Sequence, residues 1–559
     1  MNTKKILGLA MAIVFSVSGA FAVGNERGID LYRAEFYDAA KIFFLEQKNQ
    51  SAKEQAENYY YLGQIYSELQ KADSASYYYS KSLETSPDYP LGYVGQGKVA
   101  LLKGNTKEAD DLFKKATGMA KKDPSVQTAI AEVYVRAKMY SEAMDAVNKA
   151  KKINKKYAPA LLAEGDIFKN QDKLGDAAAR YEDAIRFDPN EKLAYLRLAK
   201  LYEYINTELS LKYLGQLTAI DQEYIPAYAL IGDIHRNKGT YGDALQAYEK
   251  TINIPGIPIV QRERYAQLLY FTDQYGRSLD EINYVLSKDP ENVVMHRLRA
   301  YNSFKLENYD LGVQQMEEFL QKAPQDQHIY LDYITYGRLL LKVKRTDDAI
   351  AAFQKAVALD SSKPEVYKEL ATAYETMKNY PEAIKQYEKY FELEKNPTVF
   401  DYHYFGLANY SAASQFITPE YLAATKSAEQ KAADDAEFKS YMEKGNAAFD
   451  KVIELSPDSN LGYLYKGHLN AFLDVIARSN EEAVPGIAIP YYEKALELML
   501  ADNEGGKRNA RILDIYRYFA SYYYVQKDYP QSLSYFKKIL EIQPDNQEIK
   551  QSIEAIEKM

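Results

Sequence analysis

Small residues recur along this chain with a spacing of 34 residues, and this feature constrains the fold most. The first five members of the series are Gly63, Gly97, Ala131, Gly165 and Ala199. The spacing then stays between 33 and 37 residues as far as Gly406. Many units add a second small residue 12 positions later and an aromatic or large apolar residue four positions after that. A fixed period of a few tens of residues is typical of repeat architectures built from one supersecondary unit.

The pattern within each unit predicts a helix–turn–helix pair. In residues 59–66 the apolar side chains stand three and four positions apart, which places them on one helical face. Segments such as Tyr380-Pro-Glu-Ala predict the start of a second helix, because proline in the first turn needs no amide hydrogen bond. Pairs such as Ser86-Pro87 and Asp188-Pro189 then end the unit. One such pair cannot bury its own apolar face, so neighbouring units must stack.

This order of small, tyrosine, small, aromatic and proline residues resembles the tetratricopeptide repeat family from about residue 23 to 544. The resemblance implies an all-α fold, a right-handed superhelical α-solenoid of about 14 repeats. Tyrosine stands where the family sometimes has tryptophan, as at Tyr59, Tyr93 and Tyr195. This explains why the chain has 53 tyrosines and no tryptophan. We therefore interpret most tyrosines as packing residues.

The sequence predicts five segments. Residues 1–22 have the pattern of a signal peptide, with Lys4 and Lys5, a short apolar run and Ala20-Phe21-Ala22. We expect a regular repeat array over 23–397, a repeat with a helical insertion over 398–458, irregular repeats over 459–544 and a capping helix over 545–559. Residues 253–258 are rich in proline and glycine and predict a longer junction. An exported chain of this kind is expected in the periplasm or elsewhere in the cell envelope, without a membrane-spanning segment after cleavage.

Composition argues against several classes of function. The net charge of −9 disfavours general nucleic-acid binding, and the absence of cysteine excludes disulfides and thiolate sites. The five histidines are scattered, and no catalytic motif stands out. Residues 92–98 match the spacing of a phosphate-binding loop up to Lys98. The next residue is Val99, where such a loop needs the hydroxyl of a serine or threonine, and the segment is predicted to be helical. We therefore expect neither an enzyme nor a cofactor.

The family resemblance implies that the first helices line a concave side that binds a peptide or a partner helix. In that register the earlier repeats present charged residues, including Lys98, Glu132, Asp166 and Lys169. Later repeats present an apolar strip with arginines beside it, which would suit a partner segment with hydrophobic anchors. The alternative for the strip is packing between neighbouring repeats. Its seven residues are Tyr270, Arg297, Tyr301, Phe304, Ile334, Arg338 and Leu341.

These observations favour a non-catalytic scaffold or adaptor for protein interactions in the bacterial cell envelope. One alternative is a carbohydrate-associated accessory protein of an envelope glycan uptake or assembly system. Another is an accessory subunit of an envelope enzyme or secretion machine. The sequence predicts a protein or peptide partner but does not identify it. The insertions near 412–442 and 479–490 are alternative places for partner contacts.

Overall fold

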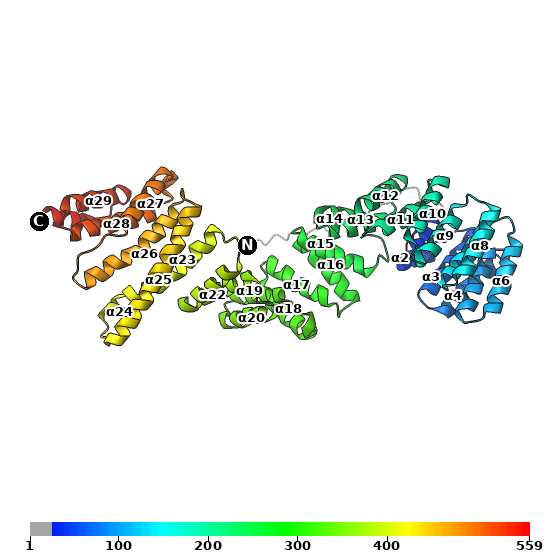
Figure 1. The fold of residues 1–559 in the computed structure, drawn as a ribbon, viewed down its shortest axis with the longest axis horizontal. Helices are drawn as coiled ribbons and strands as arrows, with labels where there is room; N and C mark the ends of the chain where they lie inside the picture. Colours follow the sequence, from blue (N-terminus) through cyan, green and yellow to red (C-terminus); the bar gives the residue numbers. More distant parts are fainter. Residues whose placement is uncertain (1–24) are drawn as a thin grey trace, which may run out of the picture. The chain divides into compact units, whose positions relative to one another are not determined.

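The computed structural model describes residues 25–559, and the predicted signal peptide over 1–22 lies outside them. Within the described part every regular element is helical, and the helices pack in consecutive pairs (Figure 1). The predicted all-α repeat fold is thereby confirmed. Two compact units are distinguished, one ending at Leu298 and the other beginning at Arg299, so the array expected over 23–397 is divided between them.

The first unit contains eight helix pairs in chain order, each joined by a short turn. Their bounds are α1 Glu26–Arg33, α2 Tyr37–Glu46, α3 Ala52–Glu68, α4 Ala72–Thr85, α5 Pro90–Leu102, α6 Thr106–Met119, α7 Pro124–Arg136, α8 Tyr140–Ile153, α9 Ala158–Asn170, α10 Leu174–Phe187, α11 Lys192–Tyr202, α12 Thr207–Ile220, α13 Ile225–Asn237, α14 Tyr241–Glu249, α15 Ile259–Phe271 and α16 Tyr275–Lys288.

The second unit continues the pairs after α17, whose range includes the division between the units. The bounds are α17 Val293–Lys305, α18 Tyr309–Lys322, α19 Tyr330–Lys342, α20 Thr346–Leu359, α21 Pro364–Thr376, α22 Tyr380–Leu393, α23 Val399–Ser414, α24 Pro419–Ala423, α25 Ala428–Leu455, α26 Asn460–Ser479, α27 Ile489–Ala501, α28 Asn509–Val525, α29 Tyr529–Ile542 and α30 Gln547–Glu557. Short 3-10 helices cover Gln325–Gln327, Gln415–Ile417 and Glu504–Gly506. The insertion forms α24 and the 28-residue α25, as its helix-favouring composition predicts.

The periodic small residues are explained by contact with the second helix of the same pair. A Cβ on Gly63 would lie 2.5 Å from the Tyr79 ring, and one on Gly337 would lie 2.3 Å from the Phe353 ring. The glycines at 97, 165, 232, 406 and 467 meet an aromatic ring in the same way. Glycine therefore makes room for an aromatic side chain at the centre of the pair.

The first unit closes on itself. The α1–α2 pair packs against α3, its neighbour in sequence, but its apolar side chains also join one buried cluster with residues of α11, α12 and α13. Figure 1 shows α2 beside α11. The junction over 253–258 takes part in this closure, because Gly256 has a φ of +75° and a Cβ there would lie 2.8 Å from the backbone nitrogen of Ala39. Glycine is needed both for that backbone conformation and for the close approach to α2.

Candidate functional site

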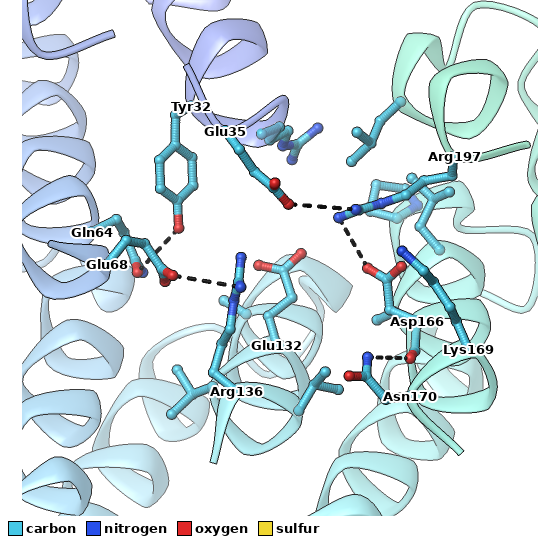
Figure 2. A pocket seen from close by; sticks show the side chains of 18 of the residues that line it. Tyr32, Glu35, Gln64, Glu68, Glu132, Arg136, Asp166, Lys169, Asn170 and Arg197 are labelled. Atoms are coloured by element: carbon cyan, nitrogen blue, oxygen red, sulfur yellow. Dashed lines mark hydrogen bonds and ion pairs between the residues drawn. The ribbon is translucent and has the colours of Figure 1, made fainter. Parts of the chain in front are cut away.

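The closed first unit contains two adjoining cavities on the side lined by its first helices. The smaller one, which we name the basic cavity, has a volume of about 320 Å³ (Figure 2). Its charged lining comes from α1, α3, α5, α7, α9 and α11, with Glu35 in the turn after α1 and Lys138 in the turn after α7. Six cationic and four anionic side chains line it: Arg33, Lys98, Arg136, Lys138, Lys169 and Arg197, with Glu35, Glu68, Glu132 and Asp166.

Ion pairs hold most of these charges in place. Lys98 Nζ donates to Gln64 Oε1 at 2.7 Å and to Glu68 Oε1 at 2.9 Å, and the Lys98 side chain is only 8% exposed. Glu68 also faces Arg136, at 3.5 Å. Burial lowers the pKa of Lys98, an effect that the nearby Glu68 partly offsets. Lys98 is therefore a structural ion-pair partner inside a helix, in agreement with our rejection of a phosphate loop.

Glu132 lies at the centre of the arrangement. It projects from α7 between Arg136 and the Asp166–Arg197 pair, whose charged atoms are 3.3 Å apart (Figure 2). Its side chain is exposed and lines the cavity. Burial raises the pKa of Glu132, and the nearby Arg33 opposes this shift. The cavity therefore holds a carboxylate that has neighbouring arginines but no ion pair within the described residues.

The larger cavity, which we name the acidic cavity, has a volume of about 1090 Å³ and lies toward the N-terminal ends of the same first helices. Seven carboxylates and three cations line it: Glu26, Asp30, Glu57, Asp88, Asp123, Glu132 and Asp221, with Arg33, Lys53 and Lys192. Five tyrosines, at positions 32, 60, 61, 89 and 157, complete much of its wall. The two cavities thus differ in charge, one with an excess of bases and the other with an excess of acids.

Helix α1 contributes to both cavities, since Tyr32 and Arg33 line each of them. Polar contacts tie α1 to distant repeats. Asp30 pairs with Lys192 of α11, which also reaches Asp221 at 3.1 Å. The first repeat therefore occupies the inner side of the later ones. The first repeat therefore reduces the space that is left for a partner on the inner side of the unit.

Of the eight charged residues that the register predicted on the inner side, four line a cavity, and Lys200, Glu203, Asp233 and Arg236 line neither. Lys98, Glu132, Asp166 and Lys169 all line the basic cavity. Sequence reasoning missed the contribution of α1 and the acidic cavity. The only sequence feature that could have indicated the position of α1 and the acidic cavity was the proline- and glycine-rich stretch over 253–258. We interpreted this stretch as a longer junction and did not recognise its contact with α2.

The residues of the expected apolar strip have different surroundings in the structure. Tyr270 and Arg297 belong to the first unit, whereas the other five residues belong to the second. Ile334 is fully buried and Tyr301 is 8% exposed, with its hydroxyl donating to Asp332 Oδ1 at 2.6 Å. At these two positions the expectation of an exposed strip is wrong, because the side chains pack within the repeats.

The remaining strip residues are more accessible. Phe304 and Leu341 are half-buried in the second unit. The Arg338 guanidinium donates from Nε and from one terminal nitrogen to Glu369 Oε1, at 2.8 and 2.6 Å, so its charge is already engaged. Partner binding by Phe304, Leu341 and Arg297 stays a prediction.

Among residues 25–559 no cluster of three or more histidine, aspartate or glutamate side chains has a geometry suited to a metal ion. No helix in the same range has both the length and the apolar character needed to cross a membrane.

The fold and the recurring glycine–aromatic contacts define an α-helical repeat protein. Comparison with protein families identifies the repeat: residues 56–89, 225–255 and 340–399 match tetratricopeptide repeat models. The chain thus contains tetratricopeptide repeats.

Relatives in other organisms share parts of this chain. The "Probable UDP-N-acetylglucosamine--peptide N-acetylglucosaminyltransferase SPINDLY" of Hordeum vulgare is 30% identical over 161 residues, which are 27% of this chain and 17% of that protein. The DnaJ homolog subfamily C member 3 of Bos taurus is 21% identical over 372 residues, or 60% of this chain and 73% of that protein. Among solved structures, the C-terminal part of a TPR repeat-containing protein from Cytophaga hutchinsonii is 23% identical, with a TM-score of 0.41. It covers 52% of this chain and 98% of its own.

Proposed function

We propose that this protein is a non-catalytic scaffold in the bacterial cell envelope, which binds a protein partner on the inner side of its repeats. The observation that carries the proposal is the helix-pair array itself, in which the first helices direct charged and aromatic side chains inward. Repeats of this kind form extended binding surfaces because each unit contacts mainly its neighbours. The location in the envelope is supported by the signal-peptide pattern over residues 1–22.

Site-specific photocrosslinking in cells tests the proposal. A photoreactive amino acid at Phe304, which is half-buried on α17, should capture a partner that mass spectrometry identifies as a protein. The matched control is the same amino acid at Leu359, which is 48% exposed at the end of the second helix α20. Equal capture at both positions, or no protein adduct at any inner position of either unit, would contradict the proposal.

Fractionation tests the location independently. The mature chain is expected to begin at Val23 and to be recovered outside the cytoplasm. Sequencing of the N-terminus gives the result directly. A cytoplasmic protein that retains Met1 would refute the envelope assignment and leave the binding role intact. Copurification of glycan in place of protein would favour the carbohydrate-associated alternative.

A further inference from the structure

The acidic cavity has carboxylates that no cation among residues 25–559 pairs with. Glu57 accepts a hydrogen bond from Asn25 Nδ2 at 3.1 Å, and Asp123 accepts one from the backbone nitrogen of Ser125 at 2.9 Å. Within residues 25–559 neither carboxylate forms an ion pair. The cation that is best placed in the wall, Lys192, is already shared between Asp30 and Asp221. The negative charge of this cavity is therefore available to a ligand.

Tyrosine rings stand beside these carboxylates. The rings of Tyr60 and Tyr61 are 5.2 Å apart and those of Tyr60 and Tyr89 are 6.2 Å apart, both in edge-on geometry. Burial raises the pKa of Tyr61 to about 12, so its ring is neutral at physiological pH. The face of a neutral tyrosine attracts ammonium and guanidinium groups. Lys192 illustrates this in the same wall, with its Nζ 5.3 Å from the centre of the Tyr224 ring.

The wall also contains an unsatisfied polar group. Tyr89 is 8% exposed, and its buried hydroxyl has no hydrogen-bond partner in the structure. A buried hydroxyl without a partner costs free energy that a bound polar group can recover. The unsatisfied hydroxyl is a feature of this wall that is independent of its charge.

The volume of the acidic cavity and the positive charge at its border with the basic cavity limit which ligands can bind. A volume of about 1090 Å³ is at the upper end of ordinary ligand pockets and admits several residues of a peptide. Arg33 stands where the acidic cavity meets the basic one, so a cation that enters meets a like charge there. A cationic side chain is therefore held near Glu57 and Asp123 and does not pass into the basic cavity.

We propose that the acidic cavity binds a lysine- or arginine-bearing segment of the protein partner, with carboxylates and tyrosine faces receiving its cationic side chains. This inference rests on the proposed function, because it takes the ligand to be part of a protein. It assigns the first unit a specificity for basic segments that the repeat fold alone does not provide.

Titration calorimetry of the mature chain with an acetylated, amidated tri-lysine peptide tests the inference. We expect saturable binding that weakens as salt is raised. Glu57→Gln should weaken it about tenfold or more, since a hydrogen bond to a charged group is lost. Glutamine still accepts the hydrogen bond from Asn25, so the fold should be retained. The matched control is Glu108→Gln, an exposed position on the second helix α6, which should bind as the parent does.

A second variant and two further probes complete the test. Tyr157→Leu removes one ring of the wall and should also weaken binding of tri-lysine. Tri-glutamate binding that competes with tri-lysine, or equal affinity of tri-lysine for Glu57→Gln and Glu108→Gln, would overturn the inference. Binding of spermidine without tri-lysine would overturn it too, because the ligand would then be a small organic cation.

The two proposals can fail separately. If photocrosslinking captures a protein partner but tri-lysine does not bind, the cavity assignment alone is wrong. If tri-lysine binds in the cavity but no protein partner is captured from cells, the scaffold function is wrong and the chemistry of the cavity stands.

Discussion

Replacing Gly165 by alanine tests the packing that defines each helix pair. A Cβ at this position in α9 would lie 2.4 Å from Cε1 and 2.7 Å from Cδ1 of the Tyr181 ring in α10. The ring has no room to move aside, because Tyr181 is fully buried and its hydroxyl donates to Asp166 Oδ1 at 2.7 Å. The substitution therefore forces either the ring or the helix to shift.

The expected magnitude follows from two opposing effects. Alanine in a helix interior is about 1 kcal/mol more favourable than glycine. Overpacking of a buried site costs about 1–3 kcal/mol. Gly165→Ala should therefore lower local stability by about 0–2 kcal/mol. The matched control is Gly215→Ala in α12, where a Cβ meets no atom within 4 Å and only the gain of about 1 kcal/mol applies.

Hydrogen exchange of the amides in α9 and α10 is the appropriate assay. Repeat arrays do not unfold in one step, so a single melting temperature would mix many units. Exchange instead reports the free energy of opening of each segment. The rate in α9 should increase in Gly165→Ala, and the rate in α12 should decrease in Gly215→Ala.

A rescue variant distinguishes overpacking from other causes. In the α7–α8 pair the same two places hold Ala131 and Val147, both fully buried in one cluster. In a Tyr181→Val background, Gly165→Ala should therefore stabilise α9 by about 1 kcal/mol. If Gly165→Ala in the parent stabilises α9 as much as Gly215→Ala stabilises α12, the explanation of the repeated glycines is refuted.

Three further predictions concern other parts of the chain. Gly256→Ala should loosen the closure of the first unit by about 1–3 kcal/mol, and faster hydrogen exchange in α1 and α2 would show it. Burial raises the pKa of Glu375 from its ordinary 4.5 to about 7. Between these two pH values the folded state holds a proton that the unfolded chain has lost, so the free energy of unfolding should fall as the pH rises from 4.5 to 7. In Glu375→Gln this decline should be absent from the opening free energy of α21, measured by hydrogen exchange at pH 5 and 7.5. An unchanged decline would count against the assignment. Lys98→Met leaves the buried Glu68 without its nearest cation and should lower the opening free energy of α5 by about 3 kcal/mol. A variant as stable as the parent would contradict the structural role of Lys98.

The local architecture could be predicted from the sequence because it depends on contacts between neighbours. The 34-residue series placed Gly63, Gly165 and Gly337 at the centre of helix pairs, and a Cβ at each would collide with a ring of the following helix. The same register placed Lys98 and Glu132 on the inner side. The same residue pattern recurs in each unit, so the helix assignment in one unit is supported by the assignment in the next.

The closure of the first unit was decided only by the tertiary structure. It brings Asp30 together with Lys192 and places Gly256 against α2, contacts that span far more than one repeat. The repeat period of the sequence determines which residues meet between adjacent units. Each unit is rotated slightly relative to the one before it, and these rotations add up over several units. Ile334 shows the same limit on a smaller scale, because a position that the register predicts on the inner surface is fully buried in the structure. The cavities and their opposite charges exist only because that accumulated rotation returns α1 to the inner side of the unit.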